Sequence, residues 1–285
     1  MTARTVLVTD STSNLSHELA AEHHIYMAPL YVVWGEESLK DGVDLTEPEL
    51  FRRLRESSEI PKTSQVSPQD FVTLFTEGRT AEQADVVVCG VLSSELSGTY
   101  ASAMQAKEMV DFPVHVVDTR QTSWALGFTM LAAARERDAG ASPEDIVKVI
   151  EETAQHTHLV FTIESLEYLH RGGRIGNASR LLGSALNIKP MLELKDGIVS
   201  PGDKVRTRKR AVEHLLKMAV APAAGRPVVR LAVIHGGVED EAQVLLEKAI
   251  ETFQPPQETY LSFVTAVLGV HVGPGAIGII VEWST

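Results

Sequence analysis

Residues Val86-Val87-Val88-Cys89-Gly90-Val91-Leu92 form an unbroken apolar run that ends in Ser93-Ser94-Glu95-Leu96-Ser97-Gly98-Thr99-Tyr100. A β-branched run that is apolar at both odd and even positions is typical of a strand buried on both faces. Good helix formers, including Ala101 and Met104, follow. In an open α/β sheet, ligands bind where such strands lead into helices, and hydroxyls and free amides there could hold a carboxylic group. Simple capping of the helix by Ser and Thr is the alternative.

The same pattern recurs on both sides of this run. Thr5–Thr9 and Val114–Val117 are short β-branched stretches that predict two more strands. Helical patterns separate the predicted strands, which favours a mainly parallel sheet. Small polar residues follow all three strands, at Asp10-Ser11, Ser93-Ser94 and Asp118-Thr119. Because the carboxyl ends of parallel strands share one edge, these residues mark a candidate binding site.

Weaker signals lie between the first two predicted strands. Ile25–Val33 is apolar but interrupted by a proline, which predicts strand-like structure, and Gly35–Asp44 predicts a polar loop. Thr46–Arg55 predicts a helix. Lys62–Ser67 is expected to be extended, because the proline that follows disfavours helix at the residue before it.

The character of the sequence changes near residue 156. Asp196-Gly197, between two apolar stretches, is a strong hairpin signal. Further strands are predicted at His158–Thr162, Val229–Ile234, Thr259–Val264 and Ile277–Glu282. Helices are predicted at Leu166–His170, Thr207–Ala219 and Asp240–Thr252. We therefore expect the α/β class with two α/β domains: residues 1–156 with a mainly parallel sheet, and residues 157–285 with a mixed sheet.

Composition is ordinary for a soluble globular protein. The 285 residues are 44% hydrophobic and 22% charged, and the net charge of −12 argues against a general nucleic-acid binder. The single cysteine, Cys89, cannot form an internal disulfide and is expected to be a small buried residue of a core strand. Neither a signal peptide nor an apolar run long enough to span a bilayer is found, so a cytoplasmic location is expected.

Positive charge is concentrated in one part of this acidic chain. Residues His170–Lys217 contain 11 Lys and Arg against 4 Asp and Glu. Such an island indicates one anionic partner or phosphate group. A solvated helix face is the alternative, and it suits Arg208-Lys209-Arg210 better than Arg174 or Arg206, which stand beside glycine turns and a strand.

Seven motifs, in this order along nearly the whole chain, resemble those of the bacterial DegV family. They are Asp10-Ser11, Lys62-Thr63-Ser64-Gln65, Leu92–Tyr100, Gly172-Gly173-Arg174-Ile175, Asn187-Ile188-Lys189-Pro190, Val205-Arg206-Thr207-Arg208 and His271-Val272-Gly273-Pro274-Gly275-Ala276. The resemblance implies two α/β domains with a long-chain fatty acid between them, such as palmitate, stearate or oleate. It also implies a lipid-presenting protein without cofactor or catalysis of its own, whose partner is a bacterial fatty acid kinase that phosphorylates the bound carboxylate.

The resemblance also implies roles for individual residues. The hydroxyls of Thr63 and Ser97 match those that hold the fatty-acid carboxylate, and His271 matches a histidine close to that head group. The neighbours Ser93 and Ser94 are further candidates for the carboxylate. Arg174 and Arg206 match a basic surface used with the kinase. The sequence departs from the family at Val66, where proline is usual, which could loosen the loop that carries Thr63 but removes no ligand atom.

A lipid carrier needs an entry route. Leu181-Leu182-Gly183-Ser184-Ala185-Leu186 is apolar, contains a glycine and lies close to the basic island in the sequence. It could make transient contact with an anionic membrane during lipid exchange. An ordinary core helix is the alternative.

Two enzymatic alternatives remain at this point. A serine-type lipid hydrolase could assemble Ser97, His271 and Asp118, with His235-Gly236-Gly237 as an oxyanion loop, but the G-x-S-x-G elbow of such enzymes is missing. An enzyme that binds a small phosphorylated metabolite fits the polar strand ends, but neither a P-loop nor a G-x-G-x-x-G sequence is found.

Metal and DNA binding are disfavoured. His23-His24 and His156-Thr157-His158 are pairs without further ligands at the usual spacing, so no metal site is expected. The acidic charge and the missing helix-turn-helix pattern count against a transcriptional regulator.

Overall fold

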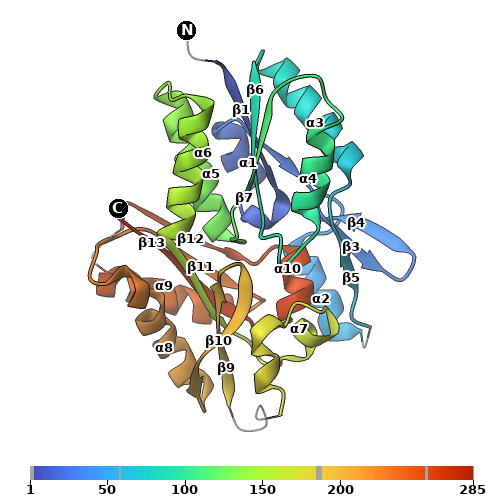
Figure 1. Cartoon of the computed structure of the whole chain (residues 1–285). Helices are drawn as coiled ribbons and strands as arrows, with labels where there is room; N and C mark the ends of the chain where they lie inside the picture. Colours follow the sequence, from blue (N-terminus) through green and yellow to red (C-terminus); the bar gives the residue numbers. More distant parts are fainter. Residues whose placement is uncertain (1–2, 58, 184–187, 254–255, 285) are drawn as a thin grey trace. The chain divides into compact units, whose positions relative to one another are not determined.

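The structure, a computed structural model, describes residues 3–57, 59–183, 188–253 and 256–284 (Figure 1). The chain forms two compact units. Unit 1 comprises Met1–Tyr31 and Ser64–Gln155, and unit 2 comprises Val32–Thr63 and His156–Thr285.

Unit 1 is built on a four-stranded sheet in the order β2-β1-β6-β7, in which every pair is parallel. Its strands are β1 (Thr5–Asp10), β2 (Ile25–Ala28), β6 (Val86–Val91) and β7 (Val114–Asp118). All residues of β1 and β6 are buried. This burial explains their unbroken apolar sequences, because a central parallel strand is covered on both faces.

Helices cover both faces of this sheet (Figure 1). They are α1 (His17–Glu22), α3 (Pro68–Ala81), α4 (Thr99–Lys107), α5 (Trp124–Asp138) and α6 (Pro143–Gln155), with a 3₁₀ turn η1 (Ser11–Ser13). Helices α3 and α4 pack together, and α5 packs on α6. A capping box between Ser67 and Asp70 begins α3, and Pro68 occupies its first position.

Unit 2 is built on a six-stranded mixed sheet in the order β10-β9-β8-β13-β11-β12. The strands are β8 (Thr157–Thr162), β9 (Lys189–Lys195), β10 (Ile198–Val205), β11 (Val228–His235), β12 (Glu258–Phe263) and β13 (Ile277–Trp283). Only the β11–β12 pair is parallel. The predicted hairpin joins β9 to β10, and Asp196 and Gly197 adopt the positive φ angles that such a tight turn requires. The predicted α/β class, with a parallel and a mixed sheet, is thus confirmed.

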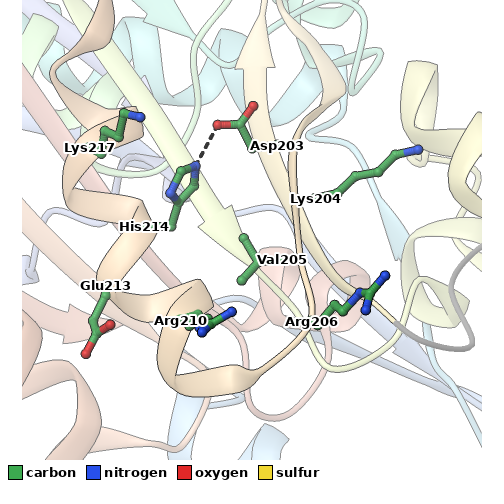
Figure 2. A pocket seen from close by; sticks show the side chains of 8 residues that line it. All are labelled: Asp203, Lys204, Val205, Arg206, Arg210, Glu213, His214 and Lys217. Carbon is green, nitrogen blue, oxygen red and sulfur yellow. Dashed lines mark hydrogen bonds and ion pairs between the residues drawn. The ribbon is translucent and has the colours of Figure 1, made fainter.

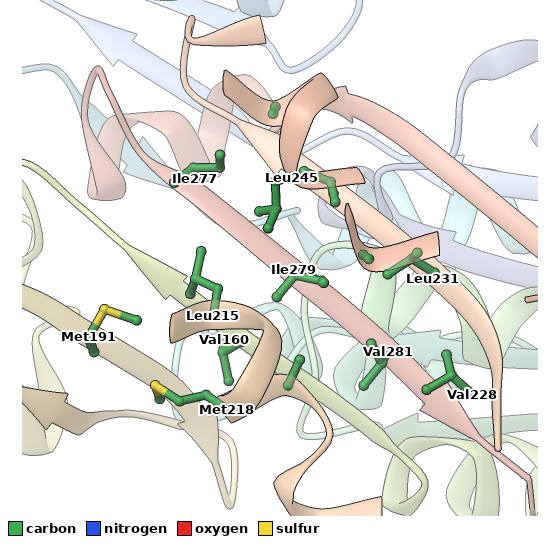
Figure 3. Close-up of a cluster of buried hydrophobic side chains, with 14 of the residues drawn as sticks. Val160, Met191, Leu215, Met218, Val228, Leu231, Leu245, Ile277, Ile279 and Val281 are labelled. Carbon is green, nitrogen blue, oxygen red and sulfur yellow. The ribbon is translucent and has the colours of Figure 1, made fainter. Parts of the chain in front are cut away.

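The helical segments of unit 2 are α2 (Glu47–Glu56), α7 (Glu167–Arg171), α8 (Arg208–Ala219), α9 (Glu239–Phe253) and α10 (Ala266–Val272), with 3₁₀ turns η2 (Gly176–Leu181) and η4 (Ala221–Ala223). Helices α8 and α9 pack on one face of the mixed sheet, where Leu215 and Leu245 meet Ile277 and Ile279 of β13 (Figure 3). These side chains alternate along β13, as expected for a strand with one face on this core.

A second, three-stranded sheet in the order β4-β3-β5 accompanies α2. Its strands are β3 (Tyr31–Trp34), β4 (Glu37–Lys40) and β5 (Lys62–Ser64). The expected polar loop over Gly35–Asp44 is therefore wrong in part, since β4 lies within it.

Segment Val32–Thr63 groups with unit 2, whereas the sequence division at residue 156 counted it with the first domain. The reason is the packing of α2 on α10. Leu50 and Phe51 of α2 are fully buried, and both would contact a Cβ atom at Gly269 of α10 within 3 Å. Only a glycine lets the two helices approach so closely. In addition, Asp41 accepts a hydrogen bond from the backbone N–H of Val267 at 3.2 Å.

Candidate functional site

The candidate site of unit 2 is centred on Thr63 and His271. Thr63 lies in β5 and His271 in the last turn of α10. The two side chains are hydrogen-bonded, with 2.8 Å between Thr63 Oγ1 and His271 Nε2. His271 is only 8% exposed, so its ring is held in a largely dry environment. The structure therefore brings together two of the residues predicted for the carboxylate.

The other side of the His271 ring lies against a glycine turn. A Cβ atom at Gly172, directly after α7, would lie 2.2 Å from His271 Nδ1. Within the described part of the chain, this Nδ1 atom is buried and has no hydrogen-bond partner. Gly172 thus supplies the flat surface on which the imidazole rests.

Burial keeps His271 neutral. It is the main cause that lowers the pKa of His271 from its ordinary value to about 4, and the nearby charge of Arg174 lowers it further. Arg174 in turn donates from Nη1 to the backbone oxygen of Gly172 at 2.8 Å. Arg174, which was predicted for a partner-facing surface, is therefore also tied to the turn beneath His271.

The loop after α10 is supported by two further close contacts. A Cβ atom at Gly273 would lie 2.4 Å from Tyr168 Cδ2, and one at Gly236 would lie 2.9 Å from the Gly273 oxygen. Gly236 also exchanges backbone hydrogen bonds with Ala276 and Gly275 at 2.8 and 2.9 Å. The His235-Gly236-Gly237 sequence therefore supports the loop that follows His271, which accounts for its glycine without an oxyanion role.

In unit 1, the predicted serines occupy the turn between β6 and α4. Ser93 is buried, and its Oγ accepts a hydrogen bond from the Glu95 N–H at 3.2 Å. Ser94 is exposed. Ser97 is half-buried, and its Oγ lies 2.9 Å from Thr99 Oγ1. Of the three hydroxyls, that of Ser97 stands immediately before the first turn of α4.

The three polar strand ends of unit 1 do converge, as predicted. Asp10 accepts a hydrogen bond from the Leu92 N–H at 2.7 Å, and Asp118 accepts one from the Ser94 N–H at 3.1 Å. Asp10 is fully buried, and burial raises its pKa to about 6 even though hydrogen bonds from Thr12 and Leu92 oppose the shift. Asp10 and Asp118 thus shape the serine-containing turn.

Arg206 lies beside a hollow of about 770 Å³ between β10 and α8. Figure 2 shows Asp203 and His214 facing each other, with 2.6 Å between Asp203 Oδ2 and His214 Nε2, while Lys204 and Arg206 project from the other side of the strand. Arg208, by contrast, is paired with Glu241 and Glu164. Arg206 is thus an exposed cation with Lys204 beside it, and Arg174 lies in the turn under His271.

The structure describes only part of Leu181–Leu186, the segment predicted to serve as a lipid gate. Leu181 is buried at the end of η2, whereas Leu182 is 42% exposed. Ser184, Ala185 and Leu186 lie outside the described residues.

The geometry weighs against the serine hydrolase alternative. The Asp118 carboxylate accepts hydrogen bonds from the backbone N–H groups of Ser94 and Arg120. His271 Nδ1, where a catalytic carboxylate would bind, lies against Gly172 instead.

In the parts of the chain that the structure covers, no three His, Cys, Asp or Glu side chains gather where they could hold a metal ion. The helices among those same residues are all too short or too polar to cross a membrane.

Two features of this site were not predicted from the sequence. Helix α10 was not predicted, although Thr265 before it and Gly273 after it are typical helix boundaries. The role of Gly172 as a surface for His271 has no local sequence signal, because the two residues meet only in the folded unit.

Comparisons with known proteins agree with the motifs. The sequence profile of the family described as "Uncharacterised protein, DegV family" matches residues 4–283. A DegV domain-containing protein of Streptomyces coelicolor is 38% identical over 283 residues, which are 99% of this chain and 99% of the relative.

Solved structures have the same fold. The structure "Fatty Acid Binding of a DegV family Protein from Thermus thermophilus" is 36% identical, with a TM-score of 0.92 over 99% of this chain and 100% of that one. A stearic-acid-binding protein from Eubacterium ventriosum is 26% identical, with a TM-score of 0.87 over 99% of this chain and 98% of that one. By its sequence profile, its relatives and its fold, the chain belongs to the DegV family.

Proposed function

We propose that this protein binds a long-chain fatty acid and that Thr63 and His271 hold its carboxylate. The observation that carries the proposal is the hydrogen bond between Thr63 Oγ1 and a buried, neutral His271. The similarity to a fatty-acid-binding protein of Thermus thermophilus and a stearic-acid-binding protein of Eubacterium ventriosum supports it.

The tautomer of His271 explains how the pair could bind a carboxylate. A proton on Nδ1 would be buried without an acceptor among the described residues, which is costly. We infer that the proton resides on Nε2 and is donated to Thr63 Oγ1. The hydroxyl hydrogen of Thr63 is then free to be donated to a ligand, and an ionised carboxylate accepts a short and strong hydrogen bond from such a donor.

The acyl chain and the head group have different tasks in this proposal. Each buried methylene contributes about 0.8 kcal/mol, whereas a hydroxyl hydrogen bond contributes about 1 kcal/mol net. The chain therefore supplies most of the affinity, and the hydroxyls of Thr63 and Ser97 fix the orientation of the carboxylate. Ser93 and Ser94 are weaker candidates, because Ser93 is fully buried and Ser94 is exposed, whereas Ser97 is half-buried.

Extraction of the purified protein tests the ligand. We expect mass spectrometry of the solvent extract to find a C16–C18 fatty acid, such as palmitate, stearate or oleate, at near-stoichiometric amount. Thr63→Val should weaken the binding of added oleate about tenfold, since it removes one charge-assisted hydrogen bond at nearly constant volume. Thr252→Val, at an exposed position of α9, is the matched control.

The opposite result would redirect the assignment. If neither an extracted lipid nor binding of palmitate or oleate is found, the fatty-acid proposal is wrong, and a phosphorylated small molecule becomes the ligand class to test. Turnover of a p-nitrophenyl ester that is lost in Ser97→Ala would instead revive the hydrolase alternative.

We further propose that the bound carboxylate is presented to a fatty acid kinase in the cytoplasm. In that reaction a carboxylate oxygen attacks the γ-phosphorus of ATP, the bond to the bridging oxygen breaks, ADP leaves and an acyl phosphate forms. The kinase is the catalyst, and this protein supplies the oriented substrate. Arg174 beside His271 and the exposed Arg206 directly after β10 could stabilise the transferring phosphate or the docked kinase.

Acyl phosphate formation with a bacterial fatty acid kinase tests this role. The Arg174→Ala, Arg206→Ala double variant should lower the rate at least tenfold while oleate binding persists. Lys248→Ala, an exposed cation of α9, should leave the rate unchanged. A parental rate in the double variant would refute the assignment of these arginines.

Membrane exchange can be tested at Leu182. If this exposed leucine contacts an anionic bilayer during lipid loading, Leu182→Glu should slow the transfer of oleate from phosphatidylglycerol vesicles. Val244→Glu, at a similarly exposed position of α9, controls for added charge. Unchanged transfer in a folded Leu182→Glu variant would remove the idea.

A further inference from the structure

The side chain of Gln65 is hydrogen-bonded to the first turn of helix α4, which begins shortly after Ser97. Gln65, two residues after Thr63 in the chain, donates from Nε2 to Ser102 Oγ at 2.9 Å. Ser102 is only 3% exposed and lies one helical turn after Gly98, the residue that precedes α4. The amide of Gln65 thus spans the first turn of the helix.

The contact depends on a glycine. A Cβ atom at Gly98 would lie 2.0 Å from Gln65 Oε1 and 2.9 Å from Gln65 Nε2, so the amide occupies the space that any larger residue would fill. The φ angle of Gly98 is −72°, which every residue type can adopt. Glycine is therefore needed here for the space that Gln65 occupies, not for backbone conformation.

Ser97 is the residue coupled to this arrangement. It directly precedes Gly98, and its hydroxyl pairs with the buried Thr99 Oγ1 at 2.9 Å. Gly98 has no side chain that could cap α4, and the Ser97 hydroxyl accepts a hydrogen bond from the Thr99 N–H at 3.3 Å instead. Gln65 adds a second restraint one turn later, at Ser102.

We infer that Gln65 is a positioning residue, which fixes the first turn of α4 and thereby directs the Ser97 hydroxyl towards a bound carboxylate. This inference rests on the proposed function, since it assumes a fatty acid whose carboxylate Ser97 contacts. It gives Gln65, the residue that follows β5, a role in orienting the Ser97 hydroxyl within unit 1.

A pair of ligands separates positioning from general stability. Oleate carries the carboxylate, and oleyl alcohol has the same chain without it. Gln65→Ala should weaken oleate binding roughly tenfold, because a charge-assisted hydrogen bond is misplaced, and should change oleyl alcohol binding less than twofold. Gln69→Ala, which alters an exposed glutamine in the first turn of α3, is the matched control.

The glycine offers an independent test. Gly98→Ala should reproduce the loss by displacing the Gln65 amide. The Gln65→Ala, Gly98→Ala double variant should bind oleate no more weakly than Gln65→Ala alone, because the clash is then absent. Melting temperatures of all variants establish that each is folded.

The outcomes are distinct. Equal weakening for oleate and oleyl alcohol, additive losses in the double variant, or parental oleate binding in Gln65→Ala would each overturn the positioning role while leaving fatty-acid binding in place. Failure of the parental protein to bind oleate would overturn the proposed function and this inference together.

Discussion

Thr63 Oγ1 and His271 Nε2 lie 2.8 Å apart although 208 positions separate the two residues in the chain. The contact joins the small β4-β3-β5 sheet to helix α10 within unit 2. With the proton on Nε2, the hydrogen bond persists when His271 is protonated at Nδ1. Protonation instead places a positive charge in a buried position, and this lowers the stability of the folded protein.

His271 should make stability depend on pH with a definite sign. Its pKa is lowered to about 4 in the folded protein, against an ordinary value near 6.5. Between these values the unfolded chain binds more protons, so stability rises with pH and is lost as pH falls through this window. In urea titrations, His271→Gln should be less stable than the parent by about 1 kcal/mol at pH 7, and this gap should shrink towards pH 4.

His170→Gln, at an exposed position of α7, is the control for this series. A gap between His271→Gln and the parent that stays constant from pH 7 to pH 4 would contradict a buried neutral imidazole.

Gly172→Ala should damage the same site from the other side. The new Cβ atom would lie 2.2 Å from His271 Nδ1, so the ring or the turn must move. We expect a loss of about 2 kcal/mol in stability, typical of overpacking, together with weaker oleate binding. Gly183→Ala introduces a Cβ atom with nothing within 4 Å and should be neutral. Equal stability of the two variants would show that His271 does not rest on Gly172.

The elements predicted correctly from the sequence are those whose own residues show a clear pattern of apolar positions or of turn residues. β1 and β6 are apolar at every position because both faces are covered, and the hairpin follows from Asp196-Gly197 alone. Helix α10 and the grouping of segment Val32–Thr63 with unit 2 depend on Gly269 admitting α2, which no local pattern reveals.

The candidate site was predictable only in part, because local motifs reveal some of its residues and tertiary contacts define the others. Motifs named Thr63 and His271, and the structure adds their contact. The roles of Gly172, Gly98 and Gln65 were not foreseen, since each is defined by the space left for a side chain far along the chain or in another element.

Asp10 should act on stability with the opposite sign to His271. Burial raises its pKa to about 6, so between pH 4 and pH 6 the folded protein binds more protons than the unfolded chain. Stability from this group therefore falls as pH rises through that window. Asp10→Asn removes the titration but replaces the acceptor of the Leu92 N–H by a donor, at a cost of about 1–3 kcal/mol.

The Asp10→Asn variant should thus be less stable than the parent, by an amount that decreases from pH 4 to pH 6. Chemical denaturation at several pH values measures this, with Asp138→Asn at an exposed helix end as control. A deficit that grows with pH would mean that Asp10 is favoured in its charged form.

The buried pair Arg230–Glu282 offers a test of what holds the mixed sheet together. The two residues are opposite each other on β11 and β13, with 2.6 Å between Nε and Oε2 and 2.9 Å between Nη2 and Oε1, and their side chains are 8% and 9% exposed. Glu282→Gln removes the carboxylate that faces Arg230 from β13 and should cost about 3 kcal/mol. In the exposed pair Arg171–Glu167, Glu167→Gln should cost less than about 1 kcal/mol.

Replacing both members of the buried pair separates charge pairing from packing. In Arg230→Met, Glu282→Leu both charges of this pair are removed together, so denaturation should find a stability close to that of the parent. If the double variant is instead as unstable as Glu282→Gln, the ion pair makes a net favourable contribution of its own, because apolar groups of similar volume do not replace it.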